Sequence, residues 1–334
     1  MQATVPSASA RRAVPFAFHG RGGEYFRIWI VNILLTILTL GIYSAWAKVR
    51  RQRYFYGNTR LGDATFEYLA DPRVILRGRL IAFGVFIVYS AANQFYPPAA
   101  MVLSLVFAGA MPWLVVRSLA FRARNSAFRN IRFDFKGTYR EAAAAFLWMP
   151  MLIPFTFGLI YPYVVRRQKE VVIGNTMYGT TPFTFSARIR DFYELFVPML
   201  VLLVGGGMVV YGLARFSLPL GLAVGGLFYL GLHSYLSAHL SNLVYNHSRI
   251  GPHRLRSSQR ARDLALLHLT NLVGIALTFG LYIPWAKVRL ARYRIEHLQL
   301  LAAGELDAFA AGEQQNVTST GEEIGEMFDL AIGV

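Results

Sequence analysis

Two stretches of the chain combine cations with aromatic rings at one spacing, which suits the binding of phosphate or another anion at a membrane surface. Both have the pattern Trp-Ala-Lys-Val-Arg-x-x-Arg-Tyr. The residues predicted to bind a headgroup or anion are Trp46, Lys48, Arg50, Arg53, Trp285, Lys287, Arg289 and Arg292. The same residues also suit plain anchoring, with the rings in an aromatic belt and the cations on its inner rim. Anchoring is the favoured interpretation, because nearly every multi-pass protein has such belts.

Three carboxylates, Glu24, Glu141 and Asp263, occupy one equivalent position at the start of apolar stretches. We expect each to cap the N-terminal amides of a helix, where a negative charge is stabilised. The alternative is an acidic cluster near a symmetry axis that binds a cation or relays protons, as intramembrane ionisable groups often do.

Polar residues deeper in the apolar stretches are sparse. The candidates to line a polar conduit are Asn32, Thr39, Thr156, Asn271 and Thr278, of which Asn32 and Asn271 are equivalent. Such side chains most often form hydrogen bonds between membrane helices. A conduit therefore requires that they converge on one cavity.

The elements that position these residues belong in a bilayer. Of the 334 residues 55% are hydrophobic and 16% charged, whereas a soluble domain carries about a quarter charged residues. Seven apolar stretches are near the ~20 residues that a crossing helix needs. They cover residues 26–47, 74–93, 99–120, 142–165, 192–213, 217–237 and 264–286. The net charge of +16 lies in short clusters between them, which favours juxtamembrane charge over nucleic-acid binding.

The chain contains an internal repeat. At an offset of 117, Phe16-x-Phe18-x-Gly20 matches Phe133-x-Phe135-x-Gly137, and Asn58-Thr59 matches Asn175-Thr176. At an offset of 239, ten of the sixteen residues 39–54 are identical to residues 278–293. We divide the chain into a polar N-terminal arm (1–15), repeat 1 (16–130), repeat 2 (131–250), a truncated repeat 3 (251–301) and an acidic soluble tail (302–334). The third copy has Leu255, Ser257 and Gln259 in place of Phe-x-Phe-x-Gly, so we expect it to have lost its strands.

The repeated motifs resemble those of the YjgN-like bacterial inner-membrane proteins, a family of unknown function. The resemblance rests on Phe16-x-Phe18-x-Gly20, on residues 39–50 with Arg53 and Tyr54, and on Asn58-Thr59. It implies a multi-pass location in the bacterial inner membrane and brings no catalytic residues. The second copy departs from the pattern, with Tyr161-Pro162-Tyr163-Val164-Val165 where Trp-Ala-Lys would stand.

The distribution of Lys and Arg predicts that the basic loops and the tail are cytoplasmic. Residues 74–120 and 192–237 fit two helical hairpins that begin and end inside. Basic charge flanks each of the stretches 26–47, 142–165 and 264–286 on both sides. Two arrangements remain open for these three: re-entrant segments that break near Thr-x-Gly and return, or plain crossings that tolerate outside arginines.

We therefore predict an all-α polytopic membrane protein with two full repeats, one truncated repeat and short cytoplasmic β-hairpins. No nucleophile motif, metal cluster, cofactor motif or phosphate loop stands out, and the chain has no cysteine, so we expect no enzyme activity. The first functional hypothesis is a transporter or channel-like protein for lipids or small anions, since broken helices often build transport sites. The alternative is a non-catalytic scaffold or assembly factor. The expected partners are the bilayer, anionic lipids, and a protein bound through the acidic tail.

Overall fold

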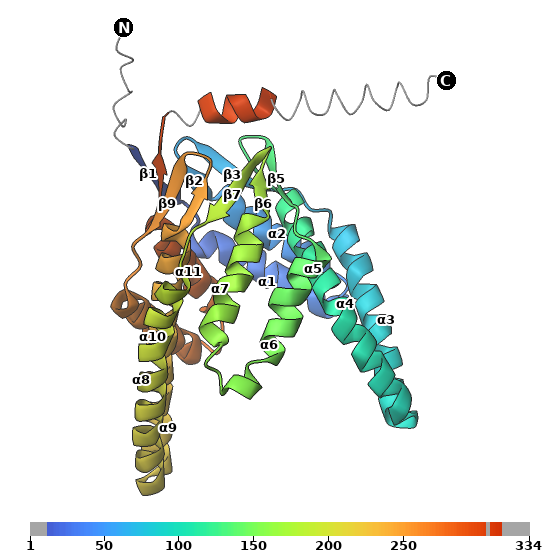
Figure 1. Cartoon of the computed structure of the whole chain (residues 1–334), viewed down its shortest axis with the longest axis vertical. Coiled ribbons are helices and arrows are strands. Elements are labelled where there is room, and N and C mark those ends of the chain that lie inside the picture. The colour runs from blue at the N-terminus through green and yellow to red at the C-terminus, as the bar shows by residue number, and fades with distance from the viewer. Residues whose placement is uncertain (1–11, 305–307, 316–334) are drawn as a thin grey trace.

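The computed structural model describes residues 12–304 and 308–315. Within them, ten short strands form one closed antiparallel barrel, in the neighbour order β1-β10-β9-β8-β7-β6-β5-β4-β3-β2. Their bounds are β1 (Arg12–Phe18), β2 (Thr59–Leu61), β3 (Ala64–Tyr68), β4 (Ser126–Phe128), β5 (Ile131–Phe135), β6 (Thr176–Tyr178), β7 (Thr181–Phe185), β8 (Ser248–Ile250), β9 (His253–Ser257) and β10 (Leu298–Ala302). Helices α1 to α11 extend from one end of this barrel, and the helix of residues 308–315 lies at the other end (Figure 1).

Two long helical hairpins extend furthest from the barrel, both from the same end of it (Figure 1). One consists of α3 (Pro72–Phe95) and α4 (Pro97–Arg124), and the other of α8 (Ile189–Phe216) and α9 (Leu218–Asn246). All four helices are long and apolar enough to cross a membrane. Their large apolar side chains are mostly exposed, as hydrocarbon-facing residues would be.

Three shorter, broken hairpins alternate with the long ones along the chain. The first is α1 (Gly22–Leu38) with α2 (Ser44–Gly57), and the third is α10 (Ala261–Leu277) with α11 (Ile283–Glu296). The second runs through α5 (Tyr139–Ala143), the π-helix η1 (Ala144–Trp148), α6 (Met149–Met151), η2 (Pro154–Thr156) and α7 (Tyr161–Gly174). Each begins and ends at barrel strands, so the chain turns back within each of the stretches 26–47, 142–165 and 264–286.

The break in each short hairpin is a residue of positive φ followed by a glycine of positive φ. The pairs are Leu40 and Gly41, Phe157 and Gly158, and Phe279 and Gly280. Glycine adopts this left-handed backbone readily because it has no Cβ. The Thr-x-Gly motif is therefore the turn that sends the chain back toward the barrel.

A polar pair closes the last helical turn where each hairpin enters the barrel. The Asn58 amide donates to the Tyr54 carbonyl and the Thr59 hydroxyl to the Phe55 carbonyl, both at 2.8 Å. Equivalent contacts are made by Asn125 and Ser126, by Asn175 and Thr176, and by His247 and Ser248, while His297 makes only the first. Five helix-to-strand junctions thus share one design, two of which carry the Asn-Thr motif itself.

The prediction of an all-α fold is wrong, because a closed barrel joins all five helical hairpins. Some of its strands are only three residues long, too short for a clear period of two in the sequence. The third copy has not lost its strands either, since β9 and β10 pair with each other and β10 pairs with β1. The Phe-x-Phe segment pairs with the segment after Asn-Thr, with Phe16 of β1 opposite Leu61 of β2.

Candidate functional site

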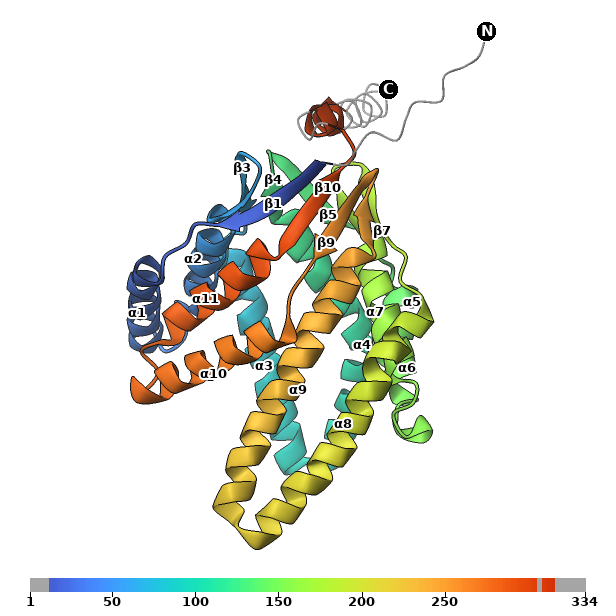
Figure 2. The ribbon, with the colours of Figure 1, turned by 90° about the vertical axis from the view of Figure 1, so that its left-hand side faces the viewer.

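A pocket of about 440 Å³ lies between α1, α2, α3 and α11. Four cations line it: Lys48 and Arg51 from α2, Arg79 from α3, and Lys287 from α11. Apolar side chains of α1, namely Trp29, Ile33 and Ile37, line it as well. Its lining therefore combines cationic with apolar side chains, as the binding site of an anionic amphiphile requires. Figure 2 shows α1, α2 and α11 close together below β1.

The helices place these cations by simple geometry. Lys48 and Arg51 are three residues apart on α2 and thus share one face. Arg79 stands two turns into α3 and donates a hydrogen bond to the hydroxyl of Ser44, the first residue of α2. On the other side, α11 packs against α1 through Trp285, whose ring lies 5.0 Å from that of Phe26 and covers Gly22. That packing brings Lys287 to the pocket.

The pocket carries positive charge without a compensating carboxylate. Among the described residues, no acidic side chain forms an ion pair with Lys48, Arg51, Arg79 or Lys287. Burial lowers the pKa of Lys48 below its ordinary value, and the charges of Arg79, Arg122 and Arg51 lower it further. Burial, with a contribution from Arg51, also lowers the pKa of Lys287. An anion in the pocket would relieve this repulsion.

Asn32 contributes an unused hydrogen-bond acceptor to the same pocket. The residue is buried, and its Oδ1 has no partner among the described residues. The equivalent Asn271 accepts a hydrogen bond from Arg289 at 2.8 Å. In the first hairpin the corresponding Arg50 donates to the Tyr43 hydroxyl at 3.0 Å. A buried acceptor without a donor costs about 1–3 kcal/mol, so a hydroxyl on a ligand would be stabilised there.

The eight residues predicted to bind a headgroup do not all meet in this pocket. Lys48 and Lys287 line it, whereas Trp46 lies against Tyr43 and Trp285 against Phe26. Four arginines bind groups of the protein itself. Arg50 donates a hydrogen bond to the Tyr43 hydroxyl, and Arg53 donates one to the Tyr68 carbonyl. Arg289 donates to the side chains of Thr270, Asn271 and Tyr282. Arg292 donates to the Gly20 carbonyl.

Sequence reasoning missed two of the four cations of the pocket, Arg51 and Arg79. Arg79 had a detectable signal, because it is a cation inside a helix of membrane-spanning length, where charge is expensive and usually functional. Arg51 had none of its own, since only the α2–α3 contact distinguishes it from the other arginines of that stretch.

The five conduit candidates do not converge. Asn32 lines the cation pocket, and Asn271 is bound to Arg289. The three threonines instead brace the breaks. Thr39 Oγ1 donates to the Leu35 carbonyl at 2.7 Å and accepts from the Tyr43 amide at 2.9 Å, and Thr156 and Thr278 make the equivalent pairs of bonds.

The three acids lie in the first turns of α1, α5 and α10. Glu141 forms a reciprocal capping box with Thr138. Glu24 and Asp263 make no side-chain cap, and tyrosine hydroxyls bind the backbone there instead: Tyr54 at Arg21 and Tyr293 at Arg260. Among the described residues no group of three or more potential metal ligands gathers.

Each broken hairpin ends in an apolar tip. Leu40 is 96% exposed, Phe157 94% and Phe279 98%, and all three have positive φ. Exposure of such side chains to water at three equivalent sites would be unfavourable, by about 1.5–3 kcal/mol each. The tips are instead suited to contact with hydrocarbon.

The fold and its exposed apolar helices define a multi-pass integral membrane protein whose helical hairpins are joined by a β-barrel. More narrowly, the chain belongs to the family described as "Bacterial protein of unknown function (DUF898)", which it matches over residues 13–327. This match and the relatives below confirm the YjgN-like resemblance.

The chain is 29% identical over 163 residues to "Inner membrane protein YjgN" of Salmonella typhimurium, covering 48% of this chain and 41% of that protein. It is also 29% identical over 158 residues to the protein of that name from Escherichia coli K12, covering 47% and 38%. The matched region is thus less than half the length of these curated relatives. No solved structure matches the chain.

Proposed function

We propose that this protein binds the phosphate-bearing headgroup of an anionic lipid in the pocket between α1, α2, α3 and α11. The cluster of Lys48, Arg51, Arg79 and Lys287, which lacks a carboxylate partner among the described residues, is the observation that carries the proposal. Each charged hydrogen bond to phosphate contributes about 1.5–3 kcal/mol. With the barrel and basic loops placed on the cytoplasmic side, the pocket faces the inner leaflet.

The composition of the pocket favours a lipid over a free anion. Trp29, Ile33 and Ile37 supply apolar surface for an acyl chain beside the cations. The unpartnered Oδ1 of Asn32 suits a headgroup that carries a hydroxyl, such as the glycerol of phosphatidylglycerol. Lipid binding here is a step that a lipid transporter needs and a non-catalytic scaffold does not, so it favours the first of the two functional hypotheses. The proposal requires no catalytic step.

The test uses the four lysines of the chain, Lys48, Lys136, Lys169 and Lys287, of which two line the pocket. The pocket variant is Lys48→Gln with Lys287→Gln, and the matched control is Lys136→Gln with Lys169→Gln. Both variants lose the same charge. Each is reconstituted with phosphatidylcholine and phosphatidylglycerol, extracted in mild detergent, and its retained lipid counted by native mass spectrometry.

We expect the pocket variant to retain phosphatidylglycerol about tenfold less strongly, and the control to match the natural chain. Equal retention by both variants would overturn the proposal and leave the scaffold hypothesis. Inorganic phosphate at millimolar concentration distinguishes the source of the anion: a lipid site resists its competition, whereas a site for free phosphate does not.

A further inference from the structure

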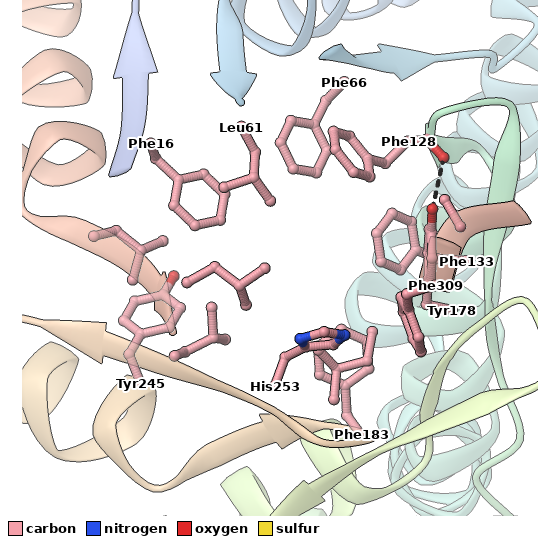
Figure 3. A pocket seen from close by; sticks show the side chains of 15 residues that line it. Phe16, Leu61, Phe66, Phe128, Phe133, Tyr178, Phe183, Tyr245, His253 and Phe309 are labelled. Carbon is pink, nitrogen blue, oxygen red and sulfur yellow. Dashed lines mark hydrogen bonds between the residues drawn. The ribbon is translucent and has the colours of Figure 1, made fainter. Parts of the chain in front are cut away.

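The barrel encloses a second cavity, of about 230 Å³, that the cation pocket does not touch. Figure 3 shows side chains from strands all around the barrel converging on it, among them Phe16, Leu61, Phe66, Phe128, Phe133 and Phe183. Tyr178 of β6 also lines the cavity. Its hydroxyl donates a hydrogen bond to the Phe128 carbonyl at 3.1 Å. Burial raises the pKa of Tyr178 to about 12, so it stays neutral.

Besides the Tyr245 hydroxyl, which also lines the cavity below the barrel, the lining holds a buried polar side chain with an unused atom. His253 is 1% exposed and points its imidazole into the cavity (Figure 3). Its Nδ1 accepts a hydrogen bond from the Ala303 amide at 3.1 Å, which leaves the proton on Nε2. That Nε2 is buried and has no partner among the described residues. Burial also lowers the pKa of His253, so the imidazole is neutral at physiological pH.

A short helix closes one mouth of the barrel. Residues 308–315 are helical, and Phe309 packs 4.6 Å from the His253 ring and 6.2 Å from the Tyr178 ring. Glu313 fixes this helix by accepting hydrogen bonds from the Thr180 amide at 2.7 Å and hydroxyl at 2.9 Å. The other mouth adjoins a larger cavity of about 640 Å³ between α2, α4, α7, α9 and α11, and Phe16, Phe66 and Phe133 line both cavities.

We propose that the barrel binds a neutral apolar molecule, two fused rings in size, whose one hydrogen-bond acceptor takes the Nε2 proton of His253. An engineered cavity of 150 Å³ binds benzene, so the larger space here admits a second ring. The molecule enters from the membrane side, through the cavity below the barrel. This inference does not rest on lipid binding in the cation pocket.

Two probes of matched shape test it: 2-acetonaphthone, which has a carbonyl acceptor, and 2-ethylnaphthalene, which has none. Binding to the full chain in phosphatidylcholine nanodiscs is measured by equilibrium dialysis, with empty nanodiscs to subtract partitioning. We expect one saturable site that prefers the ketone by about three- to tenfold, the effect of one hydrogen bond. His253→Leu should abolish the preference, and His253→Gln, which keeps an N–H donor, should retain it.

A second pair of variants tests the cavity without changing His253, in case the His253 variants lose binding because the barrel misfolds. Ala310 is buried in the cavity lining and Ala311, its neighbour on the closing helix, is exposed. Ala310→Leu should fill the space and remove saturable binding of both probes, whereas Ala311→Leu should leave it unchanged. The proposal fails if the natural chain binds neither probe saturably, if Ala310→Leu binds as well as Ala311→Leu, or if the ketone preference survives in His253→Leu.

Discussion

The contact of α2 with α3 and that of α7 with α8 are equivalent in backbone and opposite in chemistry. At the offset of 117 residues, Lys48 corresponds to Val165 and Arg79 to Phe196. Val165 and Phe196 belong to a buried apolar cluster, while Lys48 and Arg79 line the cation pocket. Since the second contact packs without cations, this architecture does not need them. The charges of the first contact therefore point to a ligand and are not required by the fold.

The largest test exchanges one residue between the two contacts. Val165→Lys would bury an unpaired ammonium beside Phe192 and Phe196, and should lower the free energy of unfolding by about 3–5 kcal/mol. Lys48→Val should leave stability unchanged or raise it, because it relieves repulsion by Arg79 and Arg51. Thermal unfolding in detergent measures both. Equal losses in the two variants would show that the contacts do not differ as described.

The second test concerns a feature that the hairpins share. The absence of cysteine in the natural chain permits Leu40→Cys, Phe157→Cys and Phe279→Cys without further changes. Apolar surroundings raise a thiol pKa, and two units would slow maleimide labelling about a hundredfold relative to Lys169→Cys. We expect such slow labelling at all three tips in sealed vesicles. Fast labelling at any one tip would show that this tip lies outside the hydrocarbon of the bilayer.

The third test uses the lowered pKa of Lys48. A lysine whose pKa lies below its ordinary 10.5 loses its proton at a lower pH, so its attraction for an anion fades earlier as pH rises. Phosphatidylglycerol retention should therefore fall with rising pH, by up to tenfold per unit above that pKa. Lys48→Arg, which stays charged, should make the profile shallower, and the double variant Lys48→Arg with Lys287→Arg should flatten it, because burial lowers the pKa of Lys287 as well. A flat profile in the natural chain would exclude Lys48 from the binding.

The sequence predicted the two long hairpins and offered a break at Thr-x-Gly as one of two alternatives, because apolar length and glycine are local signals. It did not predict the barrel. Strands of three residues, such as Thr59–Leu61, gain their stability from neighbours far along the chain, and β1 pairs with β10 across the whole sequence. Only part of the cation pocket could be predicted, for the same reason. Lys48 and Lys287 lie in a recognisable motif, whereas Arg79 joins them only through packing of α3 on α2.

The smallest effect is expected at Asn32, which corresponds to Met149 in the second hairpin. Asn32→Leu removes a buried acceptor that has no partner among the described residues, so the free energy of unfolding should stay within about 1 kcal/mol or rise. If its Oδ1 accepts from a headgroup hydroxyl, the variant should lose a fewfold preference for phosphatidylglycerol over phosphatidic acid, which lacks the glycerol headgroup. Competition between the two lipids, read by native mass spectrometry, measures this ratio. An unchanged ratio would limit recognition to the phosphate, which the four cations of the pocket would then bind without help from Asn32.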